Sequence, residues 1–138
     1  MKRKLPDLSR FEIQCLKRLW SRREGTVRDV QSDLPDGPSY STVRKIFERL
    51  EEKGAVTRAR RDGKAWVYRP AVSAAEIVRK EVRRLLESLF DGGAAELVSH
   101  LADMKELTLD DLRGIEEALA ARPKSRRGGR GDEGREGS

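Results

Sequence analysis

Apolar side chains change their spacing twice along the chain, and the order of these changes restricts the fold more than any other feature. Up to residue 53 they recur every three or four positions, which predicts helices over 10–21, 26–34 and 39–53. Two short alternating segments follow, and Asp62-Gly63 between them is a strong hairpin signal. The segments predict strands over 55–60 and 65–69. Helical spacing then returns over 73–90, 94–104 and 108–121.

Capping signals support four of these helix starts. A hydroxyl residue is followed three positions later by an acid in four pairs: Ser9 with Glu12, Thr26 with Asp29, Ser73 with Glu76, and Thr108 with Asp111. In a capping box each of the two side chains accepts a hydrogen bond from the other residue's backbone N–H. The chain is therefore expected to be mainly α-helical, with a small β-hairpin.

Three helices followed by a hairpin is the plan of a winged helix-turn-helix, in which the third helix enters the major groove of DNA. We expect this domain over residues 5–72 and a C-terminal three-helix dimerisation domain over 73–121. The buried stripe of the third helix should consist of Val43, Ile46, Phe47 and Leu50. Residues 122–138 are rich in Gly, Arg, Glu and Ser, and are expected to form a disordered basic tail.

Charge is divided unevenly between these parts. Residues 1–72 hold 18 Lys and Arg against 10 Asp and Glu, whereas residues 73–121 hold 6 against 11. A basic part joined to an acidic one suggests that the first part meets a polyanion.

The candidate DNA-binding residues lie on the outward face of the third helix and on the hairpin. We expect Arg44 to contact guanine, and Lys45 and Arg49 to contact phosphates. The full set is Ser39, Tyr40, Ser41, Thr42, Arg44, Lys45, Arg49, Arg58, Arg60, Arg61 and Lys64. A solvated charged face is the ordinary alternative, but Arg69 brings the hairpin to five cations within twelve residues. Trp66 and Tyr68 alternate on one face of a predicted strand, so we expect them to pack within the hairpin and not to stack on bases.

The candidate dimerisation residues form a heptad-like seam with spacings of 4, 3 and 4 in the fourth helix. The seam and its continuation comprise Val78, Val82, Leu85, Leu86, Leu89, Leu97, Leu101 and Leu112. Three short helices make a thin core, so pairing with a second copy is favoured over a compact monomer.

Other function classes have little support. One His, one Cys and no glycine-rich phosphate loop argue against an enzyme, a metal site or a cofactor. Cys15 fits the core better than a redox switch, and His100 fits a packed interface better than a pH sensor. No apolar run could span a bilayer and no signal peptide is visible, so we expect a cytoplasmic protein without membrane insertion.

The chain also resembles the penicillinase-repressor family of winged helices (BlaI/MecI/CopY type), over about residues 5 to 121. The matching segments are Leu8-Ser-Arg-Phe-Glu-Ile13 with Leu19-Trp20, Thr26-Val-Arg-Asp-Val30, Tyr40-Ser-Thr-Val43, Arg49-Leu-Glu-Glu-Lys-Gly-Ala-Val56, Gly63-Lys-Ala-Trp-Val-Tyr-Arg-Pro70, Leu89-Phe90-Asp-Gly-Gly93 and Leu97-Val-Ser-His-Leu101.

The resemblance implies a homodimeric repressor that binds palindromic operators and reads them with residues of the third helix: Ser39, Ser41, Thr42, Arg44 and Lys45. It also implies an inducing partner, a sensor protease or another inducer. In the antibiotic-resistance branch the protease signal leads to cleavage of an Asn-Phe bond in the fifth helix, where this chain has Ser99-His100. The copper branch binds metal through C-terminal cysteine pairs, which this chain lacks.

We therefore expect a sequence-specific repressor of transcription that binds a double-stranded operator as a homodimer. Two alternatives are a nonspecific architectural DNA-binding protein and a winged-helix module that docks another protein. Binding in the presence of competitor DNA distinguishes a specific repressor from the first alternative. The basic hairpin argues against the second, because protein–protein interfaces are usually depleted of Lys.

Overall fold

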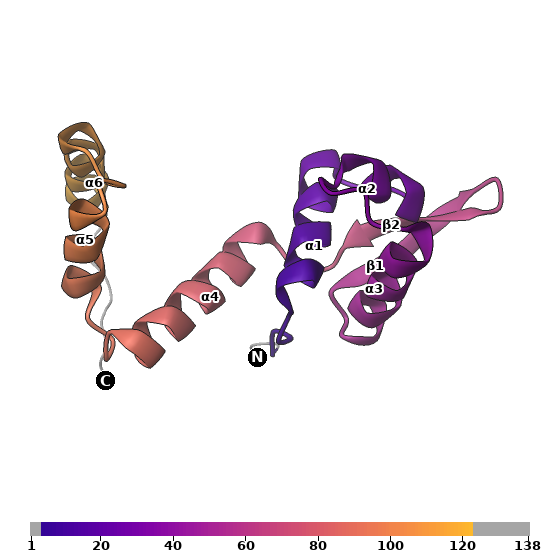
Figure 1. Ribbon diagram of the computed structural model, residues 1–138, viewed down its shortest axis with the longest axis horizontal. Coiled ribbons are helices and arrows are strands. Elements are labelled where there is room, and N and C mark those ends of the chain that lie inside the picture. The colour runs from indigo at the N-terminus through magenta and orange to yellow at the C-terminus, as the bar shows by residue number, and fades with distance from the viewer. Residues whose placement is uncertain (1–3, 123–138) are drawn as a thin grey trace. The chain divides into compact units, whose positions relative to one another are not determined.

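The computed structural model describes residues 4–122, and within that range it contains six helices and one antiparallel pair of strands (Figure 1). In chain order the elements are α1 (Arg10–Arg22), α2 (Val27–Asp33), α3 (Tyr40–Glu52), β1 (Val56–Asp62), β2 (Ala65–Pro70), α4 (Ala74–Leu89), α5 (Ala94–Asp103) and α6 (Leu109–Ala121). The predicted winged helix-turn-helix with further C-terminal helices is confirmed. The chain divides into two compact units between Leu85 and Leu86, and we call them the N-terminal and C-terminal units.

The helix starts are fixed by the predicted capping boxes. At α1 the Ser9 hydroxyl accepts a hydrogen bond from the backbone N–H of Glu12, and the Glu12 carboxylate accepts one from Ser9. Thr26 with Asp29 and Thr108 with Asp111 form the same reciprocal pairs at α2 and α6. Ser73 and Glu76 also exchange both hydrogen bonds before α4. Each pair satisfies two of the backbone donors that a helix start leaves without partners.

The core of the N-terminal unit is formed by α1, α2 and α3 together with residues of the two strands and the start of α4. All four residues predicted for the α3 stripe are buried, and Leu16 and Leu19 of α1 are fully enclosed. The apolar face of α1 is narrower than its sequence pattern suggests, because Phe11, Ile13 and Trp20 are only partly buried at its edges. Cys15 lies in the core as predicted, and burial raises the pKa of its thiol to about 12. The thiol therefore stays protonated near neutral pH.

A buried carboxylate was not anticipated at this interface. Glu12 is only 1% exposed, and its Oε1 lies 2.7 Å from Nζ of Lys53, at the end of α3. Burial alone would raise the pKa of Glu12, but hydrogen bonds from Lys53 and Ser9 lower it below its ordinary value. Glu12 therefore caps α1 and also ties its start to the end of α3.

The β1–β2 hairpin, which we call the wing, has a shorter turn than predicted. Asp62 pairs with Ala65, so only Gly63 and Lys64 lie between the strands. Gly63 has a φ of 64°, and a glycine at the first of two central positions fits a type II′ turn. The sequence analysis ended β1 at Arg60, because it assigned residues 61–64 to the turn instead of continuing the pairing through Asp62.

The wing is attached to the helices through Tyr68. Its backbone N–H and C=O both pair with Gly25, the residue before the cap of α2, at 2.8 and 3.0 Å. Its ring is buried and meets Phe47 of α3 edge-on, with the ring centroids 4.9 Å apart. Tyr68 is therefore a packing residue, as the sequence analysis favoured.

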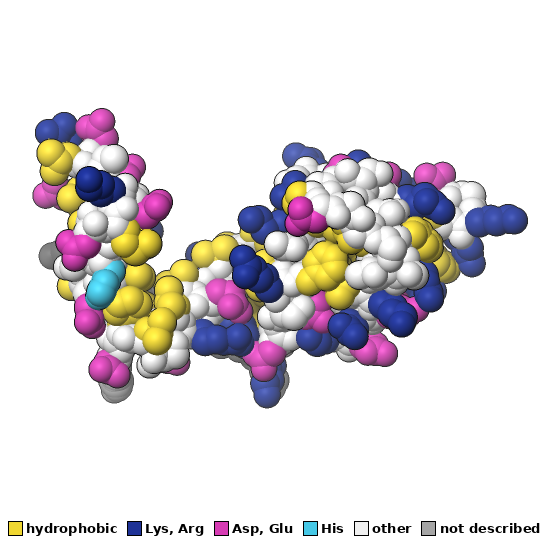
Figure 2. Space-filling model, in the orientation of Figure 1, with side chains coloured by type: hydrophobic (Ala, Val, Ile, Leu, Met, Phe, Trp, Pro, Cys, Tyr) yellow, Lys and Arg dark blue, Asp and Glu magenta, His cyan; other side chains and the backbone are white. Residues whose placement is uncertain are grey.

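The helix α4 carries apolar residues that are exposed in the described part of the chain. Ile77 joins the core of the N-terminal unit, whereas Val78, Val82, Leu85 and Leu89 are 38–70% exposed. Figure 2 shows hydrophobic side chains in a row along this helix.

The C-terminal unit has no buried residue in α5 or α6. Of the other predicted dimerisation residues, Leu86, Leu97 and Leu101 are half-buried, and Leu112 is 40% exposed. Within residues 4–122, no helix combines the length and apolar character needed to cross a membrane. The predicted basic tail lies outside the described residues, except for Arg122.

The Glu12 contact predicts a pH dependence of stability. Glu12→Gln keeps a capping side chain but removes the charge, so it should lower the free energy of unfolding by about 1–2 kcal/mol near neutral pH. The folded pKa is depressed below an unfolded value of about 4.3, so the difference should be complete above that value. It should disappear as the pH falls through the folded pKa.

Urea unfolding of both proteins between pH 3 and 7 measures this difference. Glu52→Gln is the matched control, because Glu52 is an exposed carboxylate at the end of α3. A deficit of Glu12→Gln that stays constant across this range would contradict the role assigned to the Lys53 contact.

Candidate nucleic-acid interface

The start of α3 presents a cluster of hydroxyl groups. Ser39 caps the helix, and its Oγ accepts a hydrogen bond from the backbone N–H of Thr42 at 3.1 Å. The same oxygen lies 2.8 Å from Oγ1 of Thr42 and 3.3 Å from Oγ of Ser41. The backbone N–H of Thr42 is therefore already occupied by the cap. The hydroxyls themselves remain exposed.

All the predicted contact residues of α3 are exposed, but they occupy different parts of its surface. At 100° per residue, Ser41, Lys45 and Glu48 lie opposite the buried stripe, at the centre of the exposed face. Arg44 lies on the flank nearer the wing, whereas Arg49 lies on the other flank. These two arginines therefore cannot reach the same place on a partner.

Glu48 of this helix is not among the predicted site residues. It forms an ion pair with Arg44 one turn earlier, and both side chains are about half exposed. The signal was present, because Arg and Glu four positions apart on a helix face are expected to pair. A carboxylate on this face can also accept a hydrogen bond from the amino group of cytosine.

A cleft of about 410 Å³ separates α3 from the wing. Its cationic and aromatic lining includes Arg28, Tyr40, Arg44, Arg58, Lys64 and Trp66. The Arg28 guanidinium lies 4.7 Å from the centre of the Tyr40 ring, so a cation from α2 is held against the start of α3. Arg28 was not among the predicted site residues.

A bulge in β1 determines which of the wing arginines share a face. Arg58 pairs with Tyr68 and Arg60 with Val67, which leaves Ala59 without a partner in the ladder. Opposed residues share a face, so Arg58 and Arg61 lie on the face of Trp66 and Tyr68. Without the bulge, side chains three positions apart would point to opposite faces.

On the Trp66 face, both arginines are held by several contacts. The guanidiniums of Arg58 and Arg61 lie 5.0 and 4.6 Å from the centre of the Trp66 ring. Arg58 also forms an ion pair with Glu51 of α3 at 3.0 Å, and Arg61 donates to the backbone oxygen of Lys64 at 3.0 Å. Trp66 is therefore a support for cations, and its ring is not free to stack on a base.

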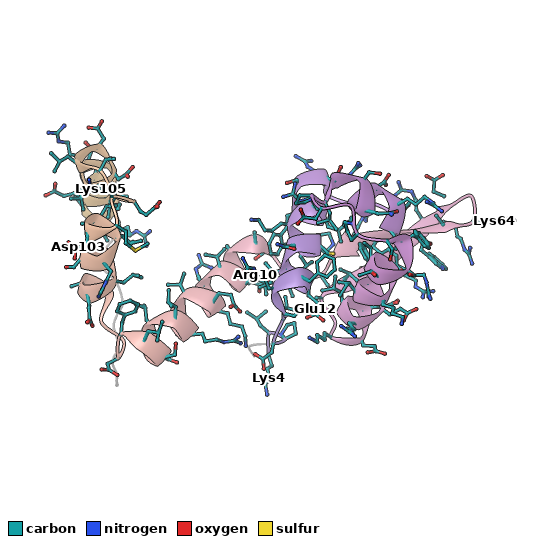
Figure 3. All side chains as sticks on the ribbon, in the orientation of Figure 1. Lys4, Arg10, Glu12, Lys64, Asp103 and Lys105 are labelled. Carbon is teal, nitrogen blue, oxygen red and sulfur yellow. The ribbon has the colours of Figure 1, made fainter. Side chains whose placement is uncertain are left out.

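On the opposite face, one carboxylate holds two arginines. Glu24, in the loop between α1 and α2, lies 2.5 Å from Arg60 and 2.9 Å from Arg69. Hydrogen bonds from Arg60 and Arg69 lower the pKa of Glu24 to about 2, so it stays ionised at neutral pH. Lys64 lies at the tip of the hairpin, away from these pairs (Figure 3).

These residues together form one surface, which we call the cationic surface: the exposed face of α3, the cleft and the wing. Figure 2 shows Lys and Arg side chains gathered over the wing and the adjoining part of the N-terminal unit. Such a surface can neutralise phosphates over the length of a duplex, while the hydroxyls and Arg44 of α3 can meet base edges.

A family model described as Penicillinase repressor matches residues 8–121. No curated protein matches the chain significantly.

Among solved structures, wild-type MarR from E. coli in its apo form is 16% identical, with a TM-score of 0.50, over 83% of this chain and 76% of that one. This likeness supports the fold alone. The DNA-binding domain of the repressor BlaI is 25% identical, with a TM-score of 0.48, over 54% of this chain and 93% of that one. Monomeric Bacillus licheniformis BlaI in complex with the blaP half-operator is also 25% identical, with a TM-score of 0.44, over 53% and 90% of the two chains.

Proposed function

Because the chain belongs to the penicillinase repressor family, we propose that it represses transcription as a homodimer bound to a palindromic operator. It is a winged-helix DNA-binding repressor and not an enzyme. The observation that carries the proposal is the cationic surface, on which α3 and the wing lie on either side of one cleft. In this arrangement α3 enters the major groove and the wing follows the phosphate backbone.

Within this surface, α3 reads the sequence and the wing supplies affinity. Arg44 contacts a base edge from the flank beside the cleft, and the Ser39, Ser41 and Thr42 hydroxyls approach the duplex closely. Lys45, at the centre of the exposed face, and Arg49, on the flank away from the wing, contact phosphates. Arg58, Arg61 and Lys64 of the wing contact the backbone, where they release counterions and make binding dependent on salt.

Residues 5–72 are the DNA-binding part of this proposal, and residues 73–121 are the dimerisation part. The apolar row on α4 supports the assignment, because Val78, Val82 and Leu85 are between 38% and 56% exposed. On α6, Leu112 and Ile115 are 40% and 47% exposed. A second copy of the chain would cover these side chains, and its two-fold symmetry would match a palindrome.

Release from DNA would require an inducing partner, a sensor protease or another inducer. The α5 helix carries Ser99-His100 at the position where the resistance branch is cut, and the His100 ring lies 5.5 Å from that of Phe90. Because this pair differs from Asn-Phe, we propose that induction does not depend on cleavage at this bond.

Fluorescence anisotropy tests the function directly. The full chain is titrated against a duplex from upstream of its own gene and against a shuffled duplex, at two salt concentrations. Preference for the native duplex, with two subunits per site, is expected. Equal binding to both duplexes would favour an architectural protein, and no binding at low salt would favour a protein-docking module.

Arg44→Ala should relax specificity at one base position and weaken operator binding by about 1–3 kcal/mol. The matched variant is Lys45→Ala, which should weaken all duplexes alike and reduce the salt slope by about one. Titration against a set of operators with single base changes measures both effects. If Arg44→Ala weakened every duplex equally, Arg44 would be a phosphate contact.

Leu85→Asp should convert the dimer to a monomer and sharply lower operator affinity, because it places a charge within the apolar row. Arg83→Asp introduces the same carboxylate on the same helix, outside that row, and should leave the dimer intact. Sedimentation velocity reports the assembly state of each variant. Unchanged sedimentation of Leu85→Asp would rule out α4 as the dimer seam.

A further inference from the structure

On the face of the wing opposite the cleft, the carboxylate of Glu24 holds two cations that a phosphate could otherwise bind. It accepts from Nη2 of Arg60 with Oε2 and from Nε of Arg69 with Oε1, so each oxygen holds one strand of the wing. The oxygens of a phosphate group likewise accept charge-assisted hydrogen bonds from arginine N–H groups. Glu24 is therefore an internal competitor for two of the wing cations.

The backbone fixes Glu24 in this place from both sides. Before it, Arg23 ends α1 with a φ of 77°, and its N–H bonds to the carbonyl of Leu19 at 2.6 Å. After it, Gly25 pairs with Tyr68 of β2, and Thr26 caps α2. Because the backbone around Glu24 is fixed in this way, only the rotamers of its side chain lose freedom when it meets the arginines.

The two arginines remain accessible while they are paired. Their side chains are 55% and 60% exposed, whereas that of Glu24 is 27% exposed. A polyanion can therefore reach Arg60 and Arg69 and exchange with the carboxylate. The exchange requires a phosphate in register with both guanidiniums, because their positions are set by Glu24 and by the pairing of the two strands.

We propose that Glu24 is a specificity-determining residue, which withholds Arg60 and Arg69 from DNA of unrelated sequence. An operator that seats α3 in the groove brings phosphates into register with the paired arginines. A nonspecific duplex is held loosely and does not bring its phosphates into this register. Arg60 and Arg69 then stay paired with Glu24, and the duplex meets two fewer free cations on the wing. This role rests on the proposed function, because it modifies the discrimination between an operator and other DNA.

Glu24→Gln tests the proposal, because it removes the charge and keeps the size of the side chain. The variant should bind a shuffled duplex several-fold more tightly than the wild type. Its salt slope on that duplex should steepen by about one to two, since up to two further cations displace counterions. Affinity for the operator should rise less, so the ratio of specific to nonspecific binding should fall.

Two comparisons make the test selective. Glu52→Gln removes one exposed carboxylate of α3 for which the described residues give no ion pair, and it reports the effect of net charge alone. In an Arg60→Met/Arg69→Met background, Glu24→Gln should no longer change the salt slope. Thermal unfolding of each variant verifies that the N-terminal unit is intact.

The proposal is overturned if Glu24→Gln acts like Glu52→Gln, if it changes both duplexes equally, or if its effect persists in the double-Met background. The operator preference of the wild-type protein is measured separately. Loss of the proposed function would appear there, as equal wild-type affinity for both duplexes, whatever the behaviour of Glu24.

Discussion

The pairing of Tyr68 with Gly25 is the contact on which the geometry of the cationic surface depends. A two-stranded hairpin is marginally stable by itself in water, so the wing needs an attachment that fixes its direction. Two backbone hydrogen bonds provide it on one side, and the buried Tyr68 ring against Phe47 provides it on the other. Because Phe47 belongs to the inner stripe of α3, the core that holds this helix also holds the wing. The width of the cleft follows from that arrangement.

The elements themselves were predictable because their signals are local. Four capping pairs and the α3 stripe, from Val43 to Leu50, depend only on residues within about one or two helical turns, and all of them are found in the structure. The hairpin was recognised for the same reason, from Asp62-Gly63. Its turn was placed two residues too wide, since sequence alone does not tell where pairing stops.

What the sequence did not indicate are the contacts that join distant segments. Glu12 meets Lys53 across 41 positions, and Glu24 meets Arg60 and Arg69 across 36 and 45. The sequence prediction takes the wing cations as one cluster, because the bulge at Ala59, which places Arg58 and Arg61 on one face and Arg60 on the other, has no signature in the residue pattern. As a result the prediction includes most cations of the surface but omits Arg28 and the acids that hold the wing. Glu48 was the exception that local spacing could have revealed.

The bulge also has a consequence for how such a hairpin can change in evolution. Ala59 has no partner on β2, so a chain lacking it would still pair Arg58 with Tyr68 and Arg60 with Val67. Every arginine would keep its side of the hairpin. Loss of a paired residue elsewhere in β1, with Ala59 still bulged, would shift part of the strand by one step and exchange the two sides there. Ala59 is thus the position in β1 where relatives can differ in length without redistributing their charges.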